Sequence, residues 1–361
     1  QKPIYEILLN PKTEIGRKGI ENFTKYYTTD IHFLKDTQKI NKKIKDINFD
    51  KELLTNIFKS WNNIKSDNNF VDKYQYIGWD KFKWLNYSVM FLHILSIYNL
   101  FSPVFNLMSP LFLFIVPFVI LKGLNVKITW PLYKNILMTQ IKTHALGKLF
   151  TSFHKVKMSQ KLYILFCAGM YVYNIYQNII SCYNFYKNAH FIVENLDTLK
   201  QYLFYTVEKM KQFESITKDY ESYSKFNKDL KANRVELNTF YEQLKTIPKE
   251  CKNMKNLFQL GKIMKYFYSI YDNQNLNEII NYSFDFNGYI DLMKGIQQSK
   301  KTHVINNTKF VRKKTVMKYK NVYHPSIENP IKNTIDFSKN KIITGPNAAG
   351  KTTILKSTII N

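Results

Sequence analysis

The sequence predicts a mainly α-helical chain that ends in the first strands of an α/β domain. Two observations lead to this expectation. Apolar residues recur three or four positions apart up to about residue 298, as Leu196, Leu199 and Leu203 do, which is the spacing of one helix face. After Gly295 the pattern changes to short β-branched segments, and the last of them leads into a loop that contains two glycines.

Changes in composition divide the 361 residues into four segments. They are a helical N-terminal segment (1–83), a hydrophobic helical region (84–187), a helical core domain (188–298) and the start of the α/β domain (299–361). This length is sufficient for two or three domains. Because the chain begins at Gln1 and ends at Asn361, eleven residues after Gly350, we expect it to be a fragment of a longer protein.

The net charge of the chain is +26, from 53 Lys and Arg against 27 Asp and Glu. Such an excess favours polyanionic partners, namely nucleic acid or anionic lipid. An alternative is that the excess follows from a composition rich in the residues of A/T-rich codons, such as Lys, Asn and Ile. Both interpretations stay open.

The cysteines and histidines predict neither disulfides nor a metal centre. Cys167, Cys182 and Cys251 are odd in number and lack metal-ligand spacing, which favours a reducing, intracellular setting. The seven histidines are scattered along the chain.

Residues 84–121 contain no Asp, Glu, Lys or Arg over 38 positions. Because prolines interrupt this run, the sequence predicts a hairpin bent near residues 102–110 rather than one straight helix. One interpretation is a membrane hairpin whose flanking lysines, such as Lys81 and Lys122, hold both ends on the cytoplasmic side. The alternative is a buried hairpin of a helical core, which is consistent with the polar residues His93 and Asn99 inside the run.

Two further stretches allow more than one interpretation. Residues 162–186 are uncharged but contain several asparagines and tyrosines, which favours an aromatic-rich helix packed in protein over a membrane span. Residues 294–320 hold nine Lys or Arg and no acid. A solvated basic face is the usual explanation of such a run, and contact with DNA is the alternative.

Three short β-branched segments are expected to form strands after the helices. They are Thr302–Val304, Thr315–Tyr319 and Lys341–Thr344. The third is followed by the pattern G-x-x-x-x-G-K-[ST], from Gly345 to Thr352, and residues 353–360 are expected to form a helix. A strand, this loop and a helix together predict a phosphate-binding loop.

Each position of the loop has a physical role. Gly345 and Gly350 let the backbone curl so that its amides point inward at a helix N-terminus and attract phosphate oxygens. Lys351 is the expected catalytic charge on these oxygens, and Thr352 offers its hydroxyl to Mg²⁺. The residues predicted to bind the phosphates of ATP are Gly345, Pro346, Asn347, Ala348, Ala349, Gly350, Lys351, Thr352 and Thr353.

The loop and the residues before it resemble the MutS family of DNA mismatch repair ATPases, whose loop typically reads TGPNMGGKS. Here the sequence is TGPNAAGKT, with Ala348 and Ala349 in place of Met and Gly. The phrase VYHPSIENPIKNTIDF, residues 322–337, is similar to the family's element around Arg-His-Pro, with Tyr323 where the family often has Arg. The resemblance is specific over residues 318–361, loose over 190–317 and absent from 1–189.

The resemblance implies an ABC-type P-loop ATPase domain preceded by core and lever helices that clamp DNA. It implies ATP and Mg²⁺ as cofactors, DNA and a second MutS-like subunit as partners, and an intracellular, DNA-associated location. Ile331 is expected, by its position, to contact the adenine. The acid that activates water and the signature serine are expected beyond Asn361, so the chain alone should not hydrolyse ATP.

Two functions follow from these expectations. The first is a DNA-associated ATPase in which ATP drives motion of the clamp and lever. The second is a membrane-anchored MutS-related ATPase with a mechanical or organisational role, held through residues 84–121.

Overall fold

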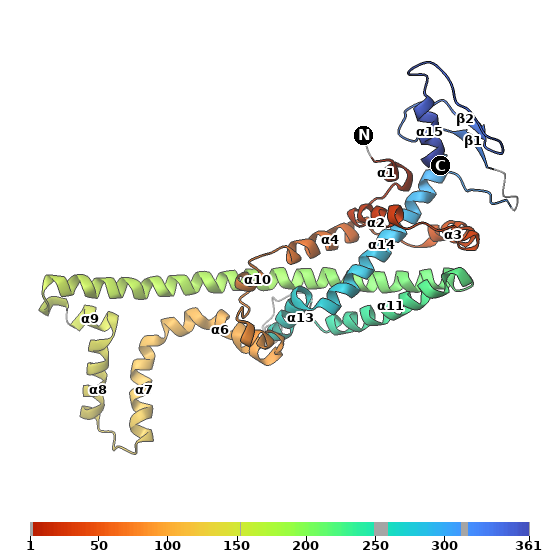
Figure 1. Cartoon of the computed structure of the whole chain (residues 1–361). Coiled ribbons are helices and arrows are strands. Elements are labelled where there is room, and N and C mark those ends of the chain that lie inside the picture. The colour runs from red at the N-terminus through yellow and green to blue at the C-terminus, as the bar shows by residue number, and fades with distance from the viewer. Residues whose placement is uncertain (1–2, 152, 249–258, 312–316, 361) are drawn as a thin grey trace. The chain divides into compact units, whose positions relative to one another are not determined.

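Helices make up 74% of the chain in the computed structural model, which describes residues 3–151, 153–248, 259–311 and 317–360 (Figure 1). The mainly α-helical prediction is therefore confirmed. The chain divides into two units. Unit 1 comprises Gln1–Ser66, Asn195–Thr246 and Ile270–Asn361, and unit 2 comprises Asp67–Glu194 and Ile247–Ser269.

Unit 1 is a helical assembly followed by a small β-ladder. One of its helices is the second part of α10 (Met158–Thr217), which continues from unit 2. Its other elements are α1 (Ile4–Leu9), α2 (Glu14–Lys25), α3 (Ile31–Lys43), η1 (Ile44–Asp46), α4 (Lys51–Lys65), η4 (Glu221–Tyr223), α11 (Ser224–Lys245), α14 (Gln274–Lys301), β1 (Lys318–Val322), β2 (Asn333–Asp336) and α15 (Lys351–Ile360).

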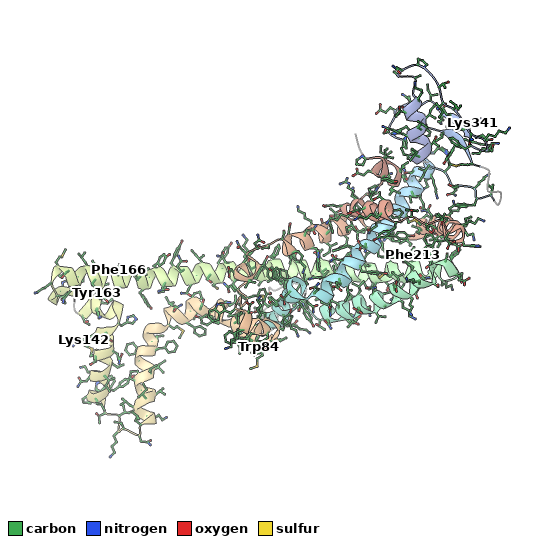
Figure 2. All side chains as sticks on the ribbon, viewed as in Figure 1. Trp84, Lys142, Tyr163, Phe166, Phe213 and Lys341 are labelled. Carbon is green, nitrogen blue, oxygen red and sulfur yellow. The ribbon has the colours of Figure 1, made fainter. Side chains whose placement is uncertain are left out.

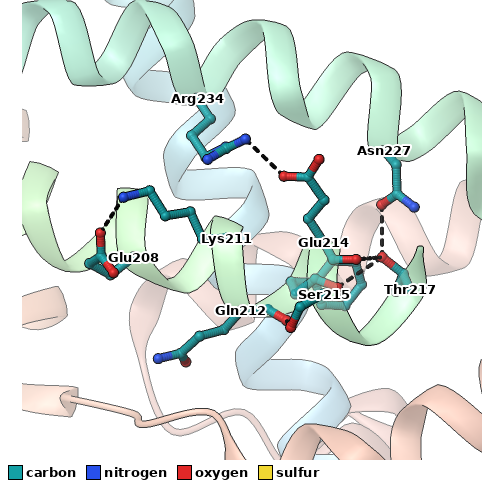
Figure 3. Close-up of polar contacts among 9 residues, drawn as sticks. Glu208, Lys211, Gln212, Glu214, Ser215, Thr217, Asn227 and Arg234 are labelled. Carbon is teal, nitrogen blue, oxygen red and sulfur yellow. Dashed lines mark hydrogen bonds and ion pairs between the residues drawn. The ribbon is translucent and has the colours of Figure 1, made fainter.

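The helix pair expected after residue 190 is present as α10 and α11. The chain reverses between Thr217 and Ser224, and polar contacts fasten the two helices near the turn (Figure 3). The guanidinium of Arg234 donates to Glu214 at 2.8 Å, and the hydroxyl of Thr217 donates to Asn227 at 2.8 Å. These contacts fix the position of α10 relative to α11 near the turn, so that their buried faces pack against each other.

Helix α14 packs closely against the N-terminal helices because glycines remove side chains at the points of approach. A Cβ at Gly295 would lie 1.8 Å from the carbonyl oxygen of Leu9, and one at Gly288 would lie 3.0 Å from that of Ile15. Between these glycines the buried carboxylate of Asp291 accepts from the amide and the hydroxyl of Thr13, at 2.8 and 2.7 Å. The start of α2 is therefore fixed to α14 by both close packing and hydrogen bonds.

Unit 2 has a small aromatic core and an arm of exposed helices. In the core, the Phe70 and Tyr76 rings stack at 5.6 Å, and the Tyr76 hydroxyl donates to the carbonyl of Met264 at 2.7 Å. The elements of the unit are α5 (Phe70–Lys73), η2 (Asp80–Tyr87), α6 (Val89–Leu107), α7 (Ser109–Gly123), α8 (Trp130–Thr143), α9 (Ala145–Thr151), η3 (Phe153–Lys155), the first part of α10 and most of α13 (Leu260–Asp272).

The hydrophobic run forms two helices that meet at Met108, inside the predicted bend. Helices α6 and α7 diverge from this point, however, and the antiparallel pair is α7 with α8 (Figure 1). The rings of Phe118 and Tyr133 join that pair at 6.1 Å. Pro110 stands in the first turn of α7, directly after this break, whereas Pro103 and Pro117 lie inside helices; the chain reverses only over residues 124–129, where Asn125 has a φ of 54°.

The run over residues 162–186 lies in α10. Its large side chains were expected to pack in protein, but many are exposed, among them Tyr163 (61%) and Phe166 (65%), both labelled in Figure 2. The predicted packing is therefore not provided by the described part of the chain.

The C-terminal strands differ from the prediction. Residues 302–304 form a turn after α14, and the predicted strand over 315–319 lies partly outside the described residues. The observed ladder pairs β1 with β2 in antiparallel fashion, with Lys318 opposite Asp336. Their side chains form an ion pair at 2.8 Å, and this contact with Lys318 holds the pKa of Asp336 well below its usual range.

Candidate nucleotide-binding site

The predicted phosphate-binding loop is a turn at the N-terminus of α15. Gly345 and Gly350 have φ angles of +156° and +83°, and Ala348 has a φ of +61°. The positive φ angles are permitted to glycine without steric cost, whereas an alanine in the left-handed region is strained by roughly 1 kcal/mol. The two glycines of the motif thus occur where the backbone requires them.

The side chain of Lys351 closes the loop on itself. Its ammonium donates to the carbonyl oxygen of Gly345 at 2.5 Å, across six residues of chain. Near it, the amide of Ala349 donates to Pro346 at 3.3 Å, and that of Ile354 donates to Gly350 at 3.0 Å. Among the described contacts none engages the amides of Lys351, Thr352 and Thr353, so the first turn of α15 presents donors to an anion.

The side chain that could help to hold a metal is Thr352. Its residue is exposed, whereas Thr353 is partly buried and its carbonyl accepts from Ser357 at 2.7 Å. No group of three His, Cys, Asp or Glu side chains in the described residues could hold a metal by itself. A Mg²⁺ at this loop would therefore share its coordination between the Thr352 hydroxyl and phosphate oxygens.

The strand expected before the loop is not formed. Lys341–Thr344 has no strand partner in the described part of the chain, and Ile342 is 91% exposed. A β-strand requires a neighbouring strand to form its hydrogen-bonded ladder, and the described residues supply one two-stranded ladder, β1 with β2. The described residues thus contain the loop and its helix but not a P-loop domain.

The segment around His324 makes no described hydrogen bond to the loop residues 345–353. The Tyr323 hydroxyl donates to the carbonyl of His303 at 3.3 Å, and His324 Nδ1 is 2.7 Å from the Ser326 hydroxyl. Ile331, the expected adenine contact, is 86% exposed in the connection between β1 and β2. No described contact brings Ile331 to the loop.

The sequence did not reveal a buried polar seam between α10 and α14. In it, Tyr202 and Ser283 share a hydrogen bond of 2.7 Å, and the Asn287 amide donates to Thr206 at 3.0 Å. The signal was present as polar residues three or four positions apart on the buried helix faces. The buried members are Tyr202, Thr206, Lys209, Ser283, Asn287 and Asp291.

Lys209 is the unusual member of this seam. It is 2% exposed, and its ammonium has no hydrogen-bond partner among the described residues. It lies over the rings of Tyr205, at 4.1 Å, and Phe49, at 4.9 Å. Burial lowers the pKa of Lys209 to about 7, with a further contribution from the charge of Lys294.

Comparison with protein-family models, curated proteins and solved structures gave no match. The functional argument therefore depends on the residues themselves.

Proposed function

We propose that the chain is part of an ATPase related to the MutS family, which binds ATP and Mg²⁺ through residues 345–353 and acts on DNA together with a second MutS-like subunit. The observation that carries the proposal is the loop motif at the start of α15. Both glycines of the motif, Gly345 and Gly350, have positive φ angles, and the ammonium of Lys351 lies 2.5 Å from the carbonyl oxygen of Gly345.

The backbone amides and two side chains of the loop would each have a separate role in binding ATP. The unengaged amides at the start of α15 would hold phosphate oxygens, and the positive end of the helix dipole would favour their charge. The Lys351 ammonium would exchange its contact with the Gly345 carbonyl for phosphate oxygens and oppose the negative charge that develops during transfer. The Thr352 hydroxyl would complete the coordination of Mg²⁺, which bridges the same oxygens.

Nucleotide binding by the chain tests the proposal. A fluorescent ATP analogue, titrated with and without Mg²⁺, should bind to the parent. It should lose most of its affinity for a Lys351→Ala variant, because the charge that opposes the phosphate oxygens is removed. Thr352→Ala should instead weaken the dependence on Mg²⁺.

Lys356→Ala is the matched control, since it removes an exposed lysine from the same helix. Equal affinity of the parent and the Lys351→Ala variant would show that the loop is not the nucleotide site. Equal loss in both lysine variants would show only a general attraction between the nucleotide and a basic chain.

A second candidate is a membrane-anchored ATPase of the same family. Among the described residues, one helix, α6, is long and apolar enough to cross a bilayer, and 17% of its 18-residue window is buried. Residues 75–135 joined to a reporter should resist extraction from membranes by alkaline carbonate. Release into the soluble fraction would leave the DNA-associated function as the better candidate.

A further inference from the structure

The positive charge of the chain is concentrated in two places rather than spread over it. Residues 81–193, all within unit 2, contain eleven lysines and no Asp or Glu. Together with the nine basic residues of 294–320, these stretches hold 20 of the 53 basic residues. The remaining 221 residues have 33 basic against 27 acidic residues, so a uniform bias of composition does not explain the excess.

The lysines of this stretch are mostly exposed and unneutralised. Lys122, Lys127, Lys134 and Lys142 are all exposed. Among the described ion pairs, the one that involves a lysine of residues 81–193 joins Lys83 to Asp80 at 2.6 Å. A surface of this kind attracts an anionic partner, whose attraction falls with salt.

The same arm exposes aliphatic side chains around a whole helix. On α7, Leu111, Ile115 and Val119 are 50%, 53% and 59% exposed, and they form one row four residues apart. Val116 and Ile120, on the neighbouring row, are 48% and 54% exposed. A docking helix needs one apolar stripe, whereas a helix that is apolar all round belongs in protein interior or lipid.

The lengths of α7 and α8, and the lysines at the turn between them, limit how deeply this hairpin can enter a lipid bilayer. The two helices, of 15 and 14 residues, are about 22 and 21 Å long, shorter than the hydrocarbon core of about 30 Å. Lys122 and Lys127 lie at the hairpin turn, and Trp130 beside them is 74% exposed. Lysine and tryptophan favour the headgroup region, so the turn of the hairpin is placed at the headgroups, and the hairpin is too short to cross the hydrocarbon core.

We propose that unit 2 docks on the surface of an anionic lipid bilayer. The apolar side chains of α7 enter the boundary of the acyl chains, and Lys122, Lys127, Lys134 and Lys142 contact the headgroups. This inference goes beyond the membrane-anchored candidate, because it names a lipid class and a contact surface without requiring a helix that spans the bilayer, and it does not depend on the nucleotide site. Figure 2 shows Lys142 on α8 of this arm.

Flotation of the whole chain with vesicles tests the inference. Vesicles of phosphatidylcholine alone are compared with vesicles that also contain phosphatidylserine, at low and high salt. The parent should float with the second kind and be released by salt. Replacing the four lysines by Gln should lower partitioning on the order of 10³-fold, since each lysine near such a surface contributes about 1 kcal/mol.

Two further variants separate the contributions. Replacing four exposed lysines of α11 by Gln makes the same change of net charge in unit 1 and should leave partitioning unchanged; these are Lys225, Lys228, Lys231 and Lys245. Ile115→Ser with Val119→Ser should weaken binding even at low salt. Because all these side chains are exposed, the variants should keep the parent's helical circular dichroism.

Three results would overturn the inference. Equal, salt-independent flotation with both kinds of vesicle would leave membrane anchoring but exclude recognition of anionic lipid. Equal losses in the two four-lysine variants, one in unit 2 and one in α11, would exclude the assigned surface. If the chain floats with neither kind of vesicle, and the unit 2 four-lysine variant loses binding to a DNA duplex, this surface binds nucleic acid instead of lipid.

Discussion

Replacement of Lys209 by Met should make unit 1 more stable at neutral pH and remove much of its dependence on pH. The pKa of the buried lysine is lowered from its ordinary value of 10.5 to about 7, first by burial. Between these values the unfolded chain binds a proton that the folded chain does not, so stability rises with pH over this window. Below pH 7 both states are protonated, and the full penalty is present.

The magnitude follows from the two pKa values. A difference of about 3.5 units corresponds to about 5 kcal/mol at low pH, and linkage predicts a rise in stability of about 3 kcal/mol between pH 6.5 and 9.5. The rings of Tyr205 and Phe49, at 4.1 and 4.9 Å, oppose this, because each contributes about 0.5–2 kcal/mol of attraction to the charged form. Desolvation is the larger effect, so the direction should hold.

Fluorescence of Trp61 provides the assay. This residue is 5% exposed in unit 1, whereas Trp79, Trp84 and Trp130 are exposed in unit 2 and can be replaced by Phe. Urea unfolding at pH 6.5 and 9.5 then reports on unit 1 alone. The parent's free energy of unfolding should rise by about 3 kcal/mol, and that of Lys209→Met should rise by much less.

Lys211→Met is the control, two residues further along α10. Lys211 is exposed and pairs with Glu208 at 2.6 Å on the surface, so its replacement should change stability by less than about 0.5 kcal/mol. A parent whose stability does not rise over this pH window would show that the cation–π contacts offset burial. The argument from desolvation would then be wrong.

Two other changes test the basic stretch and the packing of α14. Joint replacement of four basic residues should reduce the slope of log DNA affinity against log salt concentration by the equivalent of up to about four released counterions. An identical slope in parent and variant would mean that these residues face solvent and do not contact DNA. Those residues are Lys309, Arg312, Lys313 and Lys314, of which the last three lie outside the described residues. Gly295→Ala should destabilise unit 1 by about 2–4 kcal/mol, because its Cβ would lie 1.8 Å from the Leu9 carbonyl oxygen. Gly123→Ala, with nothing within 4 Å, should be close to neutral when both are compared by urea unfolding.

The sequence predicted the helices well because each one buries a periodic apolar face. Leu196, Leu199 and Leu203 all lie at 2% exposure or less in α10. Local periodicity was enough here, since the spacing of a helix face is contained in the helix itself. It was less complete for the arm, where the break between α6 and α7 falls inside the predicted bend, next to Pro110, but the antiparallel pair is α7 with α8.

The strands were predicted less well because a strand depends on a partner elsewhere in the chain. The β-branched segment over 341–344 has no neighbour in the described residues, whereas Asn333–Asp336 pairs with Lys318–Val322 and forms a strand. The polar seam was missed for a similar reason. Whether Lys209 is solvated or buried depends on α14, some 80 residues further along the chain.

The exposed residues beside the loop connect its fold with its proposed chemistry. Ile342, before the loop, is 91% exposed, and Ile359, in the helix after it, is 84% exposed. Burying such side chains contributes about 1.5–3 kcal/mol each, so partner strands that cover them would also fix the backbone on both sides of Gly345 and Gly350. A loop ordered in this way loses less entropy when it binds phosphate. Because coupling between two binding events is reciprocal, a partner that raises the affinity of this loop for ATP must itself be bound more tightly, by the same factor, when ATP is present. In the proposed ATPase, nucleotide binding would thus be coupled to the packing of the segment that covers Ile342 and Ile359.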